Sequence, residues 1–314
     1  MTSSNGTENR RAAVIGLGAM GLGMAASLVR AGFDVAGYDI APAALDRLVA
    51  LGGQRAESPA QAAAGAGIVV SVVVNTVQTE TALFGPEGCA VAMPEGAVFV
   101  SCATMSPEAA RALAARVQSS GLLYLDAPIS GGAKRAAEGA LTILTSGDPA
   151  AYEKARPALA AMAQTVHELG TEPGIAAAFK MINQLLAGVH IAAACEAITF
   201  AARQGLDIGK VYEVITQAAG NSWMFENRVP HVLAGDYTPL SAVNIFTKDL
   251  GIVMDMSRTA NFPVPMAATA LQLFTMTSAS GMGGDDDASV ARFYARTAGV
   301  TLPEKKPEDS GPNG

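Results

Sequence analysis

Charged side chains are scarce in this chain of 314 residues: Asp, Glu, Lys and Arg make up 16%, and aromatic residues only 5%. The 28 acidic residues outnumber the 21 basic ones, and the formal net charge is −7. No basic stripe is present that would neutralise a row of phosphates, so we expect no nucleic-acid partner. Hydrophobic residues make up 50%, which excludes wholesale disorder because so apolar a chain collapses into a core.

Cysteine and long hydrophobic runs are also in short supply. Cys89, Cys102 and Cys195 are odd in number, widely spaced and without a CxxC arrangement, which argues against a disulfide framework and a zinc site. We therefore expect no metal and a reducing, cytoplasmic location. The polar segment 1–10 lacks the apolar stretch of a secretory signal. The uncharged stretch 58–79 is interrupted by proline, glycine and polar residues, so we expect no membrane span.

Glycine is abundant, at 33 residues, and the first half of the chain alternates β-branched runs with Ala/Leu-rich segments. This alternation predicts an α/β Rossmann domain with a doubly wound, mostly parallel sheet. The expected strands are 12–15, 34–38, 68–74, 98–101, 123–126, 141–146 and 165–168. The expected helices are 20–31, 43–51, 59–64, 107–119 and 149–162, several of which open with proline.

The second half predicts an all-α domain, because strand signals fade from Gly174 onward. Helical patterns cover 175–203, 208–220, 242–260, 265–280 and 288–297. We expect a flexible leader (1–11), an NAD-binding domain (12–173), a helical substrate and oligomerisation domain (174–302) and a disordered tail (303–314).

A glycine-rich loop follows the first predicted strand. Gly16, Gly18 and Gly21 form G-x-G-x-x-G, and a helix is expected to open at Met20. In a dinucleotide-binding loop the first glycine permits the tight turn, the second lets a pyrophosphate approach the backbone, and the third lets helix and strand pack closely. We interpret these four residues as cofactor-binding.

Asp39 lies eighteen residues beyond Gly21, at the end of the second predicted strand. A carboxylate there accepts hydrogen bonds from the ribose hydroxyls of NAD and repels the extra phosphate of NADP. The sequence therefore favours NAD over NADP. A loop-capping aspartate is the alternative. Asn75 and Thr104 follow the third and fourth predicted strands, at the edge of the sheet where ligands of open α/β folds bind.

Lys180 and Asn183 lie three residues apart on the long helix expected from 175, so their side chains share one face. The helix is otherwise apolar, and desolvation beside packed surface disfavours the charged ammonium. We therefore expect Lys180 to act as an acid and a base. The alternative is a lysine whose ammonium extends past the apolar surface to solvent, which would show the same isolated pattern. Ser130, Gly131 and Gly132 follow another strand and offer a hydroxyl and backbone N–H groups to a substrate carboxylate; the alternative is an ordinary turn.

Four further segments occur in an order that is specific in combination: 104–107, 126–132, 174–183 and 248–250. On these residues the chain resembles the β-hydroxyacid dehydrogenases, the family of 3-hydroxyisobutyrate dehydrogenase and tartronate semialdehyde reductase, from about Ala12 to Gly299. The resemblance implies a Rossmann domain followed by a helical domain, with small hydroxy acids bound in the cleft between them. It also implies a homodimer or homotetramer.

The same resemblance implies roles for individual residues. Lys180 would be the catalytic acid/base and Asn183 would orient the reacting oxygen. Lys248 would lie near both nicotinamide and substrate, Asp249 would hold this arrangement, and Asn75 and Thr104 would line the cofactor. Lys248 and Asp249 have a plainer alternative as an exposed surface pair.

Within the family, the stretches 219–228 and 237–241 are most similar to members that oxidise L-threonate. We therefore expect NAD-dependent oxidation of a small hydroxy acid, with L-threonate converted to its 2-oxo acid as the first candidate. A 3-hydroxyisobutyrate dehydrogenase, a tartronate or succinic semialdehyde-type reductase and an NADH-binding redox sensor are the alternatives. An imine reductase is disfavoured, because that related group often lacks the lysine that Lys180 supplies.

Three positions depart from the family pattern: Ala103 replaces a common serine, Ala176 a glycine and Gln184 an asparagine. Gln184 keeps an amide on a longer arm, and its role stays open. The acidic run 285–287 is expected to cap a helix that starts at Ala288 rather than to bind a metal. Trp223, the single tryptophan, fits either a substrate pocket or a helix–helix core.

Overall fold

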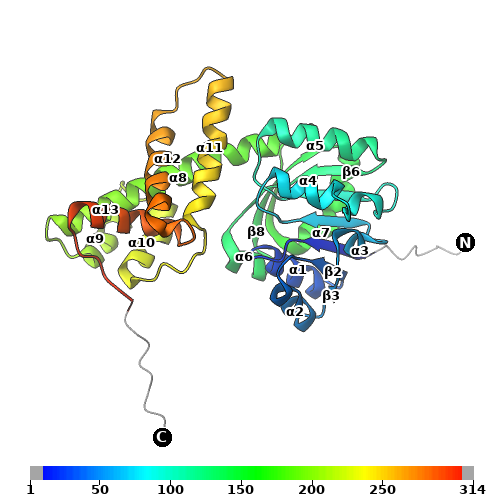
Figure 1. The fold of residues 1–314 in the computed structure, drawn as a ribbon, viewed down its shortest axis with the longest axis horizontal. Coiled ribbons are helices and arrows are strands. Elements are labelled where there is room, and N and C mark those ends of the chain that lie inside the picture. The colour runs from blue at the N-terminus through cyan, green and yellow to red at the C-terminus, as the bar shows by residue number, and fades with distance from the viewer. Residues whose placement is uncertain (1–9, 306–314) are drawn as a thin grey trace, which may run out of the picture. The chain divides into compact units, whose positions relative to one another are not determined.

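The computed structural model describes residues 10–305. The chain divides into two compact units, unit 1 ending at Met181 and unit 2 beginning at Ile182 (Figure 1). The domain boundary expected at Gly174 stays a prediction. Residues 1–9 of the expected leader (1–11) and residues 306–314 of the expected tail (303–314) lie outside the described residues.

Unit 1 contains a nine-stranded sheet in the order β3-β2-β1-β4-β5-β6-β8-β7, with β9 paired to β8. The first six strands in this order, from β3 through β2, β1, β4 and β5 to β6, are parallel to one another. Strand β8 is antiparallel to both β6 and β7, and β9 is parallel to β8. This confirms the predicted doubly wound, mostly parallel sheet. The strands are β1 (Arg11–Ile15), β2 (Asp34–Tyr38), β3 (Gln54–Arg55), β4 (Ile68–Ser71), β5 (Val98–Ser101), β6 (Leu123–Asp126), β7 (Ile129–Ser130), β8 (Leu141–Gly147) and β9 (Ala163–Glu168).

Helices cover both faces of this sheet, because successive side chains of a strand point to opposite faces. Val14 belongs to one apolar core together with residues of α1, α2 and α7, whereas Ile15 belongs to the other with residues of α3, α4 and α5. The helices are α1 (Gly21–Arg30), α2 (Pro42–Ala50), α3 (Pro59–Ala63), α4 (Thr76–Phe84), α5 (Pro107–Ser119), α6 (Gly132–Glu138) and α7 (Pro149–Met162), with a 3-10 turn at Cys89–Val91.

The structure differs from the predicted elements in four respects. The strand expected to reach Val74 ends at Ser71, since the chain then turns into α4, which Asn75 caps. Strands β3 and β7 have two residues each, too few to show a hydrophobic period. Helices α4 and α6, and a helix at Trp223–Ala234 in unit 2 (α10), were not predicted. The helix expected to end at Gly220 stops at Ile215.

Unit 2 is helical, as predicted for the second half of the chain. The long helix α8 (Ile175–Arg203) begins in unit 1 and continues into unit 2. It is followed by α9 (Ile208–Ile215), α10 (Trp223–Ala234), α11 (Val243–Thr259), α12 (Pro265–Thr277), a π-helical turn (Ser278–Met282), a 3-10 turn (Asp287–Ser289) and α13 (Val290–Ala298). Helices α11 and α12 pack through the rings of Phe246 and Phe274, whose centroids are 5.1 Å apart.

A buried ion pair holds α10 to the 3-10 turn. Arg228 Nε donates to Asp287 Oδ1 at 2.5 Å and Nη2 donates to Oδ2 at 3.1 Å. Burial raises the pKa of Asp287 to about 6, although Arg228 opposes that rise. Breaking such a pair leaves an uncompensated buried charge, so the contact specifies how these elements pack.

Among the described residues, α8 alone is long and apolar enough to cross a membrane. Half of its most apolar 18-residue window is buried within the protein, as in the core helix of a globular domain. The expectation that no membrane is a partner stays a prediction.

Candidate active site

The glycine loop connects β1 to α1 with the geometry that the sequence predicted. Gly16 has φ +90°, and a Cβ there would lie 2.8 Å from the carbonyl oxygen of Val72. At Gly21 a Cβ would collide with the carbonyl oxygen of Gly16. At Gly18, in contrast, a Cβ would meet nothing within 4 Å, so the backbone there faces open space. This loop can bring its backbone close to a pyrophosphate.

Asp39 follows β2 and is hydrogen-bonded to this loop. Its Oδ2 accepts from the backbone N–H of Leu17 at 2.6 Å, and its Oδ1 accepts from Ala41 at 2.8 Å. The carboxylate therefore supports both the glycine loop and the turn after β2. Ile40 beside it is 88% exposed and offers an apolar surface next to the acid.

Asn75 and Thr104, also predicted to bind the cofactor, follow β4 and β5 at the same edge of the sheet. Backbone bonds from Val72 to Ile15 and from Cys102 to Ser71 hold the segments after β4 and β5 there. Asn75 Oδ1 caps α4 by accepting from Gln78 N at 2.9 Å, so part of its hydrogen-bonding capacity is structural. Thr104 is half-buried. Met20 precedes α1 and is partly buried against the core.

A buried carboxylate anchors the N-terminus of α8. Asp126 Oδ2 accepts from the backbone N–H groups of Gly174 and Ala177 at 3.1 and 2.9 Å. Ser146 donates to the same oxygen at 3.4 Å and accepts from Ala176 N at 2.9 Å. Burial raises the pKa of Asp126 to about 6, against the opposing effect of the bonds from Ala177, Gly174 and Ser146. The first turn of α8 is thus fixed to the end of β6.

Lys180 lies in the second turn of α8 and is 7% exposed. Its Nζ donates to the backbone carbonyl oxygen of Ile129 at 2.9 Å. Ile129 is the first residue of β7 and directly precedes Ser130. Unit 1 therefore brings the predicted acid/base next to the predicted carboxylate-binding segment.

That segment has an unusual backbone. Gly131 has φ +134° and Gly132 has φ +80°, both in the region that favours glycine. A Cβ at Gly131 would lie 3.0 Å from Arg135 Cδ, whereas at Gly132 it would meet nothing within 4 Å. Two successive glycines thus leave the backbone after Ser130 accessible.

In unit 2, the predicted residues Asn183, Lys248 and Asp249 are connected through Gln184. Asn183 Nδ2 donates to Gln184 Oε1 at 2.9 Å, and Gln184 Nε2 donates to Asp249 Oδ2 at 2.5 Å. Lys248 Nζ donates to Asp249 Oδ1, also at 2.5 Å. Asp249 is 1% and Gln184 7% exposed. We call this chain of hydrogen bonds the amide relay.

Further candidates from the sequence have structural positions. Asp286 caps the 3-10 turn by accepting from Ala288 N at 3.1 Å, so the acidic run does cap, although the α-helix itself begins at Val290. The Nδ1 atom of His231 lies 3.5 Å from Oδ1 of Asp286. Trp223 is 54% exposed and is not part of a helix–helix core. No cluster of three metal-ligating side chains occurs within residues 10–305.

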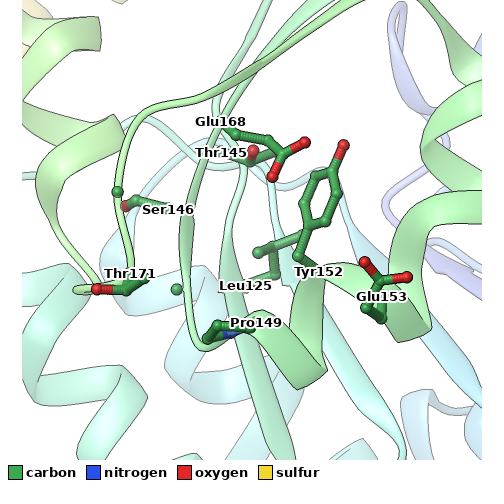
Figure 2. Close-up of a pocket in the computed structure, with 10 residues that line it drawn as sticks. Leu125, Thr145, Ser146, Pro149, Tyr152, Glu153, Glu168 and Thr171 are labelled. Atoms are coloured by element: carbon green, nitrogen blue, oxygen red, sulfur yellow. The ribbon is translucent and has the colours of Figure 1, made fainter.

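A pocket of about 280 Å³ in unit 1 contains none of the predicted site residues (Figure 2). Figure 2 shows the Tyr152 hydroxyl beside the Glu168 carboxylate, with Glu153 nearby. Burial and the neighbouring Glu168 raise the pKa of Tyr152. Ser146, which supports α8, also lines this pocket. Both carboxylates are exposed, and no basic side chain is among the residues that line this pocket.

The fold is that of the hydroxyacid dehydrogenases. Residues 11–170 match the family model of the NAD binding domain of 6-phosphogluconate dehydrogenase, and residues 174–294 match that of the NAD-binding domain of NADP-dependent 3-hydroxyisobutyrate dehydrogenase. The chain belongs to the β-hydroxyacid dehydrogenase family and is an NAD-binding oxidoreductase that acts on CH–OH groups.

Individual relatives cover nearly the whole chain. An L-threonate dehydrogenase of Cupriavidus necator is 52% identical over 297 residues, 95% of this chain and 99% of that protein. One of Pectobacterium atrosepticum is 46% identical over 301 residues, 96% and 98% of the two chains. The crystal structure of a 3-hydroxyisobutyrate dehydrogenase from Salmonella typhimurium is 45% identical, with a TM-score of 0.86, and covers 90% of this chain and 99% of that one.

Sequence reasoning missed two groups of residues. Asp126 begins the segment 126–132, but no sequence pattern indicated that its carboxylate holds α8. Ser146 carried no sequence signal at all. Gln184 was noted only as a departure from the family pattern. Its longer arm was the available signal, since an amide that far from the helix can reach a neighbouring helix.

Asp126 generates a prediction about pH and stability. Its pKa is raised from 3.8 to about 6, so the folded state favours the protonated acid, and that stabilisation is lost as the pH rises through about 6. Asparagine does not ionise and keeps an oxygen acceptor. The free energy of unfolding of Asp126→Asn minus that of the unmodified protein should therefore rise by about 1–3 kcal/mol from pH 4 to pH 7. Urea unfolding across this range measures it, and a difference independent of pH would contradict it.

Proposed function

We propose that the enzyme oxidises L-threonate, a small polyhydroxylated acid, at its 2-hydroxyl with NAD as the hydride acceptor. The observation that carries this proposal is the contact of Lys180 Nζ with the Ile129 carbonyl, immediately before Ser130. Relatives at 52% and 46% identity are named L-threonate dehydrogenase, which supports the choice of substrate.

The chemistry assigned to Lys180 follows from its hydrogen bond. A neutral amine that donates to the Ile129 oxygen keeps its nitrogen lone pair as a proton acceptor. Nζ can then take the hydroxyl proton of the substrate as the carbon–hydrogen bond gives up hydride, and in the reverse reaction the ammonium returns that proton. NAD, when bound, supplies the hydride acceptor.

The position of the carboxylate-binding segment favours the 2-hydroxyl. Ser130, Gly131 and Gly132 would hold the substrate carboxylate through a hydroxyl and accessible backbone N–H groups. Because Ile129, whose carbonyl accepts the hydrogen bond of Lys180, is the preceding residue, this segment would hold the substrate carboxylate and the reacting carbon close together. In our proposal Asn183 orients a substrate oxygen, Lys248 contributes positive charge, and Gly16, Gly18, Met20, Gly21, Asp39, Asn75, Thr104 and Asp249 serve the cofactor.

A 3-hydroxy acid is the second candidate, because a structural relative at 45% identity is named 3-hydroxyisobutyrate dehydrogenase. A screen of L-threonate, 3-hydroxyisobutyrate, tartronate semialdehyde and succinic semialdehyde, each with NAD(H) and NADP(H), distinguishes the candidates. Binding of NADH without turnover of any of them would instead favour the redox sensor.

Replacing Lys180 by methionine tests the proposed acid/base. Lys180→Met keeps an apolar stem without an amine, so turnover of L-threonate should fall by about 1,000-fold or more, because a proton acceptor is lost from the reacting centre. NADH binding, followed by fluorescence, should persist. The exposed Lys154→Met is the matched control. Wild-type turnover in Lys180→Met would refute the assignment.

Replacing Asp39 tests the cofactor preference. Asp39→Asn keeps one oxygen acceptor but removes the negative charge that would repel the 2′-phosphate of NADP. The ratio of kcat/KM for NAD to that for NADP should fall by about 10- to 100-fold, which corresponds to about 1–3 kcal/mol. Steady-state kinetics with both cofactors measures it. The exposed Asp46→Asn, in α2, should leave the ratio unchanged.

We also propose a cytoplasmic homodimer or homotetramer. All three cysteines are buried free thiols, which suits a reducing compartment. In unit 2, apolar side chains of α8 and α12 line a groove of about 480 Å³ that includes Val189, Phe200, Met266 and Leu273. Phe200 is 63% and Met266 64% exposed, so this apolar surface suits a second subunit.

Phe200→Glu should shift the mass measured by light scattering from that of the oligomer towards 31.9 kDa, because a charge at this groove opposes burial. Val91→Glu, at a 90% exposed position in unit 1, is the control and should leave the mass unchanged. An oligomer that survives Phe200→Glu would exclude this groove as the interface, and a monomeric unmodified protein would refute the proposed assembly.

A further inference from the structure

In the amide relay of unit 2, the buried carboxylate of Asp249 determines which group of each amide donates and which accepts. Asp249 is 1% exposed, and its Oδ1 is occupied by the Lys248 ammonium at 2.5 Å. An ionised carboxylate can only accept hydrogen bonds, so the group that faces Oδ2 must be the NH₂ of Gln184, at 2.5 Å. The carbonyl Oε1 of Gln184 then points the other way.

The same logic fixes the next amide. Oε1 of Gln184 is an acceptor, so the group of Asn183 that faces it, at 2.9 Å, must be its NH₂. The side-chain carbonyl of Asn183 is consequently directed away from Gln184. Asn183 is exposed, and its Oδ1 accepts no hydrogen bond from the residues that the structure describes. It presents an acceptor oxygen.

The packing of α8 against α11 sets the length of the relay. Gly188 lies one turn beyond Gln184 on the same face of α8. A Cβ at Gly188 would lie 2.9 Å from Leu250 Cδ1 and 3.1 Å from Phe246 Cδ1, so glycine permits a close approach of the two helices. Gln184 spans the remaining gap to Asp249. An asparagine, one methylene shorter, would fall short of this partner or give up its bond to Asn183.

We propose that Gln184 is a positioning residue that fixes Asn183 Oδ1 as the acceptor for a substrate hydroxyl other than the reacting one, in place of the orientation of the reacting oxygen that the family resemblance implies for Asn183. This inference rests on the proposed function and refines it: the site selects acids that carry an additional hydroxyl. A substrate without that hydroxyl would leave a fixed acceptor unpaired, and a site built for a hydrogen bond discriminates strongly against the analogue that lacks it.

A double-mutant cycle tests whether Gln184 acts through Asn183. Gln184→Met and Asn183→Ala should each lower kcat/KM for L-threonate by about 10- to 100-fold, the loss of one well-placed hydrogen bond. In the Asn183→Ala background, Gln184→Met should change kcat/KM by less than about twofold. Losses that multiply in the double variant would overturn the proposal.

The substrate comparison tests the selected hydroxyl. With 2-hydroxybutanoate, which keeps the 2-hydroxyl but lacks the 3- and 4-hydroxyls, both single variants should differ from the unmodified enzyme by less than about threefold. Equal losses for the two acids would show that Gln184 supports the site as a whole, and would overturn the assignment to a second hydroxyl.

Gln184→Glu gives a second test in a variant of nearly the same shape. Its carboxylate has no proton to donate to Asp249 and places a second negative charge beside that buried carboxylate, so kcat/KM for L-threonate should fall by about 10-fold or more. Gln204→Glu, an equal change at the exposed residue just after α8, should leave kcat/KM unchanged. An unchanged kcat/KM in Gln184→Glu as well would contradict the relay.

Failure of the proposed function is separable from failure of the relay. If no hydroxy acid is turned over, the function fails, and NMR of the protein labelled with ¹⁵N-asparagine still reports on Asn183. Its side-chain amide signal, assigned by its loss in Asn183→Ala, should move in Gln184→Met and stay unchanged in Gln204→Glu. An unmoved signal in Gln184→Met would overturn the relay.

Discussion

The carboxylate of Asp126 accepts hydrogen bonds from the backbone N–H groups of Gly174 and Ala177. The hydroxyl of Ser146 accepts one from the backbone N–H of Ala176. The first backbone N–H groups of any helix lack intrahelical partners, so in a buried helix terminus they must be satisfied by side chains. Here the acceptors come from β6 and β8, and the sheet therefore fixes the start of α8. Lys180 is in the second turn, close enough to this anchor to share its rigidity.

The chain segment that begins at Asp126 also positions the Lys180 amine and the proposed carboxylate site. The chain leaves β6 at Asp126 and three residues later reaches Ile129, whose carbonyl holds Lys180. Ser130 follows directly. One short segment thus contains the anchor of the helix, the partner of the amine and the start of the proposed carboxylate site. Their spacing is set by covalent geometry as well as by packing, which suits chemistry that needs precise placement.

Sequence patterns predicted the parallel sheet, the long α8 and the glycine loop because each has a strong local signal: buried β-branched runs, a long apolar helical period and a fixed glycine spacing. They failed where the signal is tertiary. Helix α6 begins at two glycines and shows no amphipathic period, and β7 exists only through its pairing with β8. Lys180 was identified by resemblance and spacing, but its partner Ile129 could not be, since a backbone carbonyl has no sequence signature.

The amide relay shows why a charge-poor chain would use a glutamine at position 184. Asp249 is buried, and its two oxygens are satisfied by one ammonium and one amide. A second charged residue in place of the amide would need a buried partner of its own, at a desolvation penalty of several kcal/mol per ion in typical proteins. A neutral amide avoids this penalty, because it donates at one end and accepts at the other. It therefore passes the orientation set by the carboxylate to the next amide without adding charge, and the exposed Asn183 receives a defined polarity from a residue that is itself 1% exposed.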